Sequence, residues 1–247
     1  MLELKRASRH FGGVRAVDEL DLTVAEGEIF GLIGPNGSGK TTAVNLITGM
    51  LPLSSGSIRF GDRDLEDLPT HRRLHLGIAR TFQGIRLFGQ LTVWQNLWVA
   101  QNSPEDRARQ RFVPRWLGGR GGAREEVMQL LEFSGLAHKQ VELAANLPFG
   151  EQRRLELARA LAAKPRLLLL DEPAAGMNAE EIRELDERIR GLRGRGITVL
   201  LIEHHMELVM AVTDRVAVLN FGQKIAEGTP AEVQNDSLVR KAYLGGD

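Results

Sequence analysis

The chain has 247 residues, of which 43% are hydrophobic and 26% are charged, so it is long enough to bury a full core as one large domain or as one domain with a subdomain. Lysine plus arginine equals aspartate plus glutamate at 32 each, so the chain as a whole has no net charge that would attract nucleic acid or anionic lipid. It contains no cysteine, which excludes a disulfide framework and a thiolate metal site.

The N-terminal segment predicts half-buried antiparallel strands, because residues 2–8 and 19–24 alternate apolar and polar side chains. Between them Phe11 precedes a glycine turn, where it is either an aromatic that stacks on adenine or a core side chain. The first residues lack the apolar core of a signal peptide, and no apolar run approaches the length of a membrane span. We therefore expect a cytosolic protein or one that is peripheral on a membrane.

The stretch at 34–42, GPNGSGKTT, lies between an apolar run at 29–33 and another at 43–47. Its glycines allow the backbone amides to point inward, and the N-terminus of the following helix adds a positive end. Lys40 would reach the outer phosphates, and the Thr41 hydroxyl would ligate Mg²⁺. The pattern predicts a P-loop, which binds a nucleoside triphosphate at a strand-to-helix turn.

The middle of the chain predicts short elements and one long loop. The expected elements are a strand at 56–61, a helix at 69–76, a buried strand with its loop at 77–83, and helices at 92–101 and 123–136. Trp94 and Trp98 are four residues apart on one helix face, so they form either a docking surface or part of the core. Residues 103–123 are rich in glycine and arginine and predict a solvated loop that a partner or lipid headgroups could contact.

Two further segments carry candidate chemistry. A glycine turn at 147–152 opens a helix that reaches 161; its N-terminus is a second candidate phosphate site, with an ordinary amphipathic helix as the alternative. The apolar run at 166–170 predicts a parallel strand that delivers Asp171 and Glu172 at the edge where ligands of α/β sheets bind. Beside a P-loop, Asp171 would help to hold Mg²⁺ and Glu172 would accept a proton from the attacking water. A surface carboxylate pair is the alternative.

The C-terminal third predicts a charged helix at 179–193 and a buried strand at 197–202. His204 follows that strand and would point toward the same ligand edge. The remaining expected elements are a helix at 206–212, a hairpin of 215–220 and 223–227, and two short helices within 230–244.

Together Gln83, the turn at 147–152, the Asp171-Glu172 pair and His204 have the order and spacing of the Q-loop, signature, Walker B and switch elements. The whole chain thus resembles the nucleotide-binding subunits of ABC transporters. The resemblance implies an α/β P-loop NTPase core with an antiparallel β subdomain and an inserted helical subdomain. The core and β subdomain would comprise residues 1–85 and 165–247, and the helical subdomain residues 86–164.

Several phrases resemble the G-type (LivG-like) ATPase subunit of branched-chain amino acid importers; they are LIGPNG at 32–37, ARTFQGIRLF at 79–88, QRRLELARAL at 152–161 and EPAAGMN at 172–178. This resemblance implies an ATPase that uses ATP and Mg²⁺ on the inner face of the cell membrane. Its partners would be a second, similar ATPase in a head-to-tail dimer, two membrane permeases and, indirectly, an extracytoplasmic binding protein, with no nucleic acid.

The resemblance also implies roles for single residues. Phe11 would stack on adenine, Glu172 would be the general base, and His204 would hold the γ-phosphate and the attacking water. The Mg²⁺ ligands would be Thr41, Gln83, which also counts among the catalytic residues, and Asp171, acting through water. The ATP phosphates would be held by Asn36, Gly37, Ser38, Gly39, Lys40, Thr41 and Thr42. The partner's nucleotide would be capped in trans by Leu147, Pro148, Phe149, Gly150 and Glu151.

Three departures from the superfamily pattern stand out. The signature usually contains a serine where this chain has Pro148, so one hydrogen bond to the γ-phosphate, about 0.5–1.5 kcal/mol net, is lost. Asn178 replaces the usual aspartate of the D-loop, and His205 follows the switch histidine where aspartate is common. The last two changes would weaken signalling between the two ATP sites, and neither substitution would be inactivating.

Two other functions remain open. An ATPase of lipopolysaccharide export is suggested by residues 68–73 and 239–244, although the signature and the Arg-Thr-Phe-Gln phrase argue against it. A non-transport ABC ATPase that acts on DNA or ribosomes is disfavoured, because this chain has one cassette and no net charge.

Overall fold

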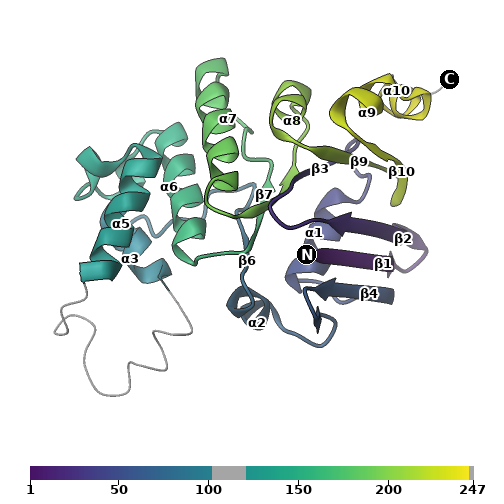
Figure 1. Cartoon of the computed structure of the whole chain (residues 1–247), viewed down its shortest axis with the longest axis horizontal. Coiled ribbons are helices and arrows are strands. Elements are labelled where there is room, and N and C mark those ends of the chain that lie inside the picture. Colours follow the sequence, from purple (N-terminus) through teal and green to yellow (C-terminus); the bar gives the residue numbers. More distant parts are fainter. Residues whose placement is uncertain (102–120, 245–247) are drawn as a thin grey trace.

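A computed structural model describes residues 1–101 and 121–244, and its centre is a six-stranded sheet of order β10-β9-β3-β8-β7-β6 (Figure 1). All neighbouring strands are parallel except β9 and β10, which form an antiparallel hairpin. The bounds are β3 (Ile29–Ile33), β6 (Ile78–Arg80), β7 (Leu167–Asp171), β8 (Thr198–Ile202), β9 (Arg215–Asn220) and β10 (Gln223–Gly228). The predicted buried strands are therefore confirmed, and β3, which ends at the P-loop, lies between β8 and β9.

Strands β7 and β8 are apolar on both faces because each face packs against a different layer. Leu168 and Leu170 join the cluster that contains the helices at one end of the molecule, whereas Leu167 and Leu169 join the cluster beneath the second sheet. This alternation has a period of two, as a strand requires. A continuous run of apolar residues thus fixes the strand that carries Asp171.

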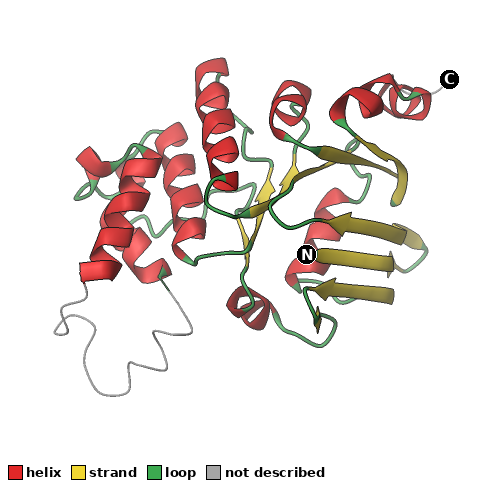
Figure 2. Cartoon of the chain, viewed as in Figure 1, coloured by secondary structure: helices red, strands yellow, loops and turns green. Residues whose placement is uncertain are grey.

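The second sheet is antiparallel, with the order β2-β1-β4-β5. Its strands are β1 (Leu2–Phe11), β2 (Val14–Val24), β4 (Ser55–Phe60) and β5 (Arg63–Asp64). β1 and β2 are longer than the predicted segments at 2–8 and 19–24, because pairing continues through irregular register to Phe11 and Val14 at the tip. This sheet lies at the opposite end of the molecule from helices α3, α5 and α6 (Figure 2).

The helices occupy nearly the predicted positions: α1 (Lys40–Thr48), α2 (Thr70–His75), α3 (Val93–Ala100), α5 (Gly121–Ser134), α6 (Phe149–Ala162), α7 (Ala179–Arg193), α8 (Met206–Val212), α9 (Pro230–Asn235) and α10 (Ser237–Leu244), with 3-10 turns at Ala137–Lys139 and Ala144–Asn146. Most of the predicted loop at 103–123 lies outside the described residues, but residues 121–123 already belong to α5, so this end of the prediction was wrong. No helix in the described parts of the chain is long and apolar enough to cross a membrane.

The helices α3, α5 and α6 share one apolar cluster with one face of the central sheet. A capping box fixes the start of α3, because Thr92 accepts a hydrogen bond from Gln95 N and the Gln95 side chain accepts one from Thr92 N. Trp94 and Trp98 stack on each other, with ring centroids 4.7 Å apart, and are half-buried against the cluster. These two rings therefore contribute to the core while part of their surface stays accessible.

Candidate active site

The P-loop begins where β3 ends, and two of its glycines are required by close backbone contacts. Gly34 has φ +149° and Gly39 has φ +106°; a Cβ on them would lie 2.1 Å from the Leu219 carbonyl oxygen and 2.3 Å from that of Ala16. A larger side chain would therefore force the loop away from β9 and β2. The loop lines a cavity of about 310 Å³, whose walls are Val14, Arg15, Ala16, Asn36, Gly37, Ser38, Gly39, Lys40, Thr41, Thr42, Glu172 and Phe221.

Lys40 begins helix α1, and its side chain is buried in the loop. Nζ donates hydrogen bonds to the carbonyl oxygens of Gly34 at 2.8 Å and Pro35 at 2.9 Å. Burial lowers the pKa of the Lys40 ammonium, and the charges of Glu172 and Asp171 oppose that shift. Within the described residues the buried Ser38 hydroxyl has no hydrogen-bond partner. An anion in this loop would supply an acceptor for both side chains, so the residues present fit a bound phosphate.

Glu172 stands at the end of β7 and faces the same cavity. Its backbone has φ +47°, which is uncommon for a residue with a side chain, and its amide donates to Ile202 O at 2.8 Å. Gln83 Nε2 donates to Glu172 Oε2 at 2.9 Å. His204 Nδ1 lies 3.8 Å from the same oxygen. The structure thus brings together Gln83, Glu172 and His204, which are far apart in the sequence and were predicted to act together.

Asp171 is held by an arginine to which the sequence analysis gave no role. Arg80 Nη2 donates to Asp171 Oδ2 at 2.6 Å, and both side chains are buried. Arg80 Nη1 donates to Asn45 Oδ1 at 2.6 Å on helix α1. The sequence signal for this contact was weak: Arg80 is the last residue of an apolar strand and lies three residues before Gln83.

Glu203 is a second residue that the sequence analysis passed over. Its side chain is fully buried, and Oε2 accepts hydrogen bonds from the backbone amides of His204 at 2.7 Å and His205 at 3.0 Å. Oε1 accepts one from Ala174 N at 2.8 Å. Glu203 therefore ties the segment that carries His204 to the segment that follows Glu172. A carboxylate directly after the apolar strand was the available signal.

The signature turn lies apart from the P-loop cavity, because none of Leu147, Pro148, Phe149, Gly150 and Glu151 lines it. Pro148 forms the N-cap of α6. A Cβ on Gly150 would lie 2.1 Å from Glu181 Oε1, so the turn packs closely against the start of α7. Phe149 is exposed by 46% and approaches Gly176. The exposed ring and the missing serine distinguish this turn from the superfamily pattern.

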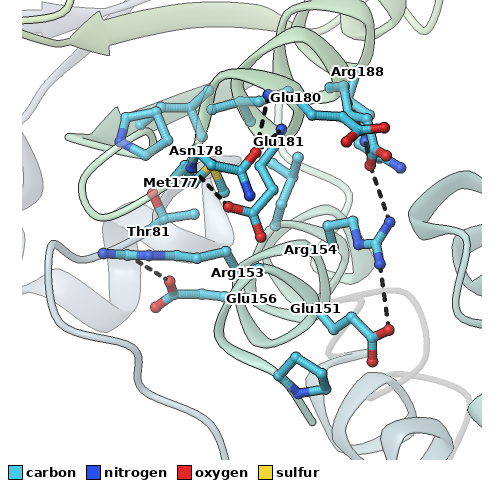
Figure 3. Close-up of a pocket in the computed structure, with 17 residues that line it drawn as sticks. Thr81, Glu151, Arg153, Arg154, Glu156, Met177, Asn178, Glu180, Glu181 and Arg188 are labelled. Carbon is cyan, nitrogen blue, oxygen red and sulfur yellow. Dashed lines mark hydrogen bonds and ion pairs between the residues drawn. The ribbon is translucent and has the colours of Figure 1, made fainter.

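Asn178, which stands where the D-loop usually has aspartate, caps helix α7. Its side chain accepts hydrogen bonds from Glu180 N at 2.9 Å and Glu181 N at 3.0 Å, while Glu181 Oε2 accepts one from Asn178 N at 2.9 Å. This capping box is drawn in Figure 3. Asparagine caps a helix as well as aspartate does, so the start of α7 is preserved.

Helix α6 also holds the loop that carries Gln83. Arg153 Nη1 donates to Phe82 O at 2.9 Å and to Glu156 Oε2 at 3.3 Å, and Nη2 donates to Gln83 O. Glu156 Oε1 accepts a hydrogen bond from Arg86 N at 3.2 Å. Figure 3 shows the Arg153–Glu156 pair at the edge of a separate cavity of about 270 Å³ between α6 and α7. Burial raises the pKa of the Glu156 carboxyl, although its hydrogen bonds oppose that shift.

This combination of a P-loop, a carboxylate pair at the end of a neighbouring strand and a separate helical layer defines an ATPase of the ABC cassette class. The profile of the family described as "ABC transporter" matches residues 17–175, and one described as "Branched-chain amino acid ATP-binding cassette transporter" matches residues 223–247. The chain belongs to the ABC transporter family.

Individual relatives agree with this assignment. The chain is 43% identical, over 99% of its length and 98% of the relative's, to the high-affinity branched-chain amino acid transport ATP-binding protein LivG of Salmonella typhimurium. The lipopolysaccharide export system ATP-binding protein LptB of Escherichia coli is 36% identical over 100% of this chain and 98% of its own. The solved ADP conformation of MJ1267, an ATP-binding cassette of an ABC transporter, has a TM-score of 0.86 and 32% identity over 99% of this chain and 98% of its own. The expected fold and the LivG-like resemblance are confirmed.

Proposed function

We propose that this chain is the ATP-hydrolysing subunit of an importer for branched-chain or other amino acids. The observation that carries the proposal is the identity of 43% to the LivG relative along the whole chain. The match of residues 223–247 to the branched-chain profile supports it, because that match lies outside the general ABC profile. The 36% identity to LptB makes lipopolysaccharide export the second candidate.

In this proposal the amides of Asn36 to Thr42 and the Lys40 ammonium bind the ATP phosphates, and Phe11 stacks on adenine. Thr41, Gln83 and Asp171 hold Mg²⁺, directly or through water; their oxygen atoms are the ligands that Mg²⁺ prefers. When bound, the ion neutralises charge on the phosphates. In this proposal the γ-phosphate lies beside Glu172, which lines the same cavity as Lys40.

Glu172 takes the proton of the attacking water, and His204 orients that water and the γ-phosphate. The 2.9 Å hydrogen bond from Gln83 to Glu172 supports this assignment, because it joins two of the residues that the proposal assigns to hydrolysis. Glu203 is a positioning residue here, because it holds the backbone amides of His204 and His205.

The second half of the site comes from another chain. We propose a head-to-tail dimer with a second ABC ATPase, in which Leu147 to Glu151 cap the partner's nucleotide. That capping role is consistent with their position outside the cavity of their own P-loop. The dimer binds two permease subunits on the cytoplasmic face of the membrane, and an extracytoplasmic binding protein delivers the substrate.

The helical region at 86–136 would contact the permeases and transmit closure of the dimer. Hydrogen bonds of Arg153 and Glu156 connect α6 to the loop that carries Gln83. Movement of the helical layer should therefore also move this loop, which supports the proposal. The half-buried Trp94 and Trp98 lie on α3 in that layer.

Uptake of labelled leucine and valine by cells that lack this chain tests the proposal. Wild-type chain should restore leucine and valine uptake, and Glu172→Gln should not. Glu187→Gln, an exposed glutamate on α7, is the matched control and should behave as wild type. Unchanged amino acid uptake, with lipopolysaccharide failing to reach the cell surface, would instead favour the second candidate.

A further inference from the structure

The tip of the β9–β10 hairpin carries an aromatic side chain in an unfavourable place. Phe221 is exposed by 85%, so almost none of its apolar surface is buried. It forms a two-residue turn with Gly222, and both have positive φ, +45° and +82°. Turns of this kind favour asparagine or glycine at the first position, and a bulky residue there is strained. Neither the packing nor the backbone therefore accounts for a phenylalanine at this position.

The hairpin tip is fixed rigidly to the P-loop. Gly222 N donates to Ser38 O at 2.9 Å, and Gly222 O accepts a hydrogen bond from Asp18 N at 2.9 Å. Gln223 Nε2 donates to Asp18 Oδ2 at 3.1 Å. A Cβ on Gly222 would lie 2.7 Å from Arg15 O, which shows how closely the turn approaches β2. Phe221 is thus held at a fixed place beside the loop.

Phe221 lines the same cavity as the P-loop amides. By residue type, the lining of this cavity has a polar part, the P-loop residues with Lys40, and an apolar part, which includes Val14 and Phe221. Val14 is itself exposed by 66%. Phosphates require the polar part, and the faces of a purine are the most apolar surface of ATP, so the apolar rim suits the base.

We propose that Phe221 is a purine-contacting residue of the ATP site, and that its ring packs against the base of the nucleotide whose phosphates lie in the P-loop. This inference rests on the proposed position of ATP. It adds to the stacking on adenine proposed for Phe11, which lies on the neighbouring β1–β2 tip, where it pairs with the cavity-lining Val14.

The test compares two ligands of the full chain, MgATP and Mg-tripolyphosphate, because tripolyphosphate has the phosphates but no base. Isothermal titration gives both dissociation constants for wild type, Phe221→Ala, Phe221→Asn and Phe221→Trp. Since base–aromatic stacking is worth about 1–3 kcal/mol, the alanine and asparagine variants should bind ATP about tenfold more weakly. Both should keep the wild-type affinity for tripolyphosphate, and the tryptophan variant should bind ATP as wild type does.

Two further measurements separate this contact from a folding effect. Asparagine adopts positive φ more readily than phenylalanine, so Phe221→Asn should raise the melting temperature while it lowers ATP affinity. Val141→Ala, which removes an equally exposed apolar side chain (82%) from another part of the surface, should change neither affinity.

Unchanged ATP affinity in Phe221→Ala, or an equal loss for both ligands, would overturn the inference while the proposed function stands. A wild-type chain that binds neither ligand would overturn the proposed ATP site, and this inference with it.

Discussion

The side-chain amide of Gln83 donates a hydrogen bond of 2.9 Å to Glu172, a residue 89 positions later in the chain. Gln83 is itself held through its carbonyl oxygen by Arg153 of helix α6. A continuous chain of contacts therefore runs from the helix that follows the signature turn to the proposed general base. Displacement of α6 would therefore change the surroundings of Glu172 through Gln83.

The Arg80–Asp171 ion pair gives the first prediction. Arg80→Met leaves the Asp171 carboxylate buried without a partner and should lower the free energy of unfolding by about 3–5 kcal/mol. The double variant Arg80→Met/Asp171→Asn buries no unpaired charge, so it should recover most of that loss. Urea unfolding of the two variants and wild type measures both effects. A double variant as unstable as Arg80→Met would show that the pair does not stabilise the fold in this way.

The contact between Arg153 and the Gln83 loop gives the second. Arg153→Met removes the hydrogen bonds to the carbonyl oxygens of Phe82 and Gln83 and the ion pair with Glu156, but it changes no residue of the P-loop. We expect kcat for ATP in the assembled transporter to fall about tenfold, with KM nearly unchanged, because small displacements of a catalytic group are costly.

Arg154→Met is the matched control for this change. Arg154 is the next residue along α6 but pairs with Glu184 at 3.0 Å and Glu151 at 3.6 Å, away from the loop. An equal loss of kcat in both variants would mean that any disturbance of α6 has this effect, and the specific role of Arg153 would be wrong.

Burial of Glu156 predicts a pH dependence of stability. Its folded pKa is raised above the ordinary value of 4.5, so above that value the folded state binds more protons than the unfolded state does. The contribution of Glu156 to stability should therefore fall as the pH rises from about 4.5 through the raised pKa, and it is most favourable below this window. In Glu156→Gln this part of the dependence should vanish. Urea unfolding at several pH values tests it, and an unchanged slope in the variant would contradict it.

Much of the fold followed from local patterns in the sequence. The helix at 179–193 was predicted with its observed bounds from its charged amphipathic pattern, and the structure adds a capping box of Asn178 and Glu181 at its start. The strands β1 and β2 were predicted too short. Their tips, residues 10–11 and 14–15, are exposed, and the register is irregular there, so the tips lack the apolar alternation that marks a half-buried strand.

The site was predictable only where a residue belongs to a motif. The spacing of Lys40, Glu172 and His204 indicated a shared site, but the buried partners Arg80 and Glu203 depend on sheet order. Glu203 reaches Ala174 because β7 and β8 are neighbours, and nothing local in the sequence determines that strand order. Phe221 likewise reaches the P-loop cavity through the pairing of β9 with β3.

The ATPase rate of the assembled transporter with Glu172→Gln tests the central claim most directly, with ATP affinity measured on the same preparation. Removal of a general base should lower kcat at least about 100-fold. ATP affinity should be unchanged, because Lys40 and the loop amides are intact, and ATP should trap the closed dimer. Turnover by Glu172→Gln at the wild-type rate would contradict the assignment of Glu172 as the base that activates water.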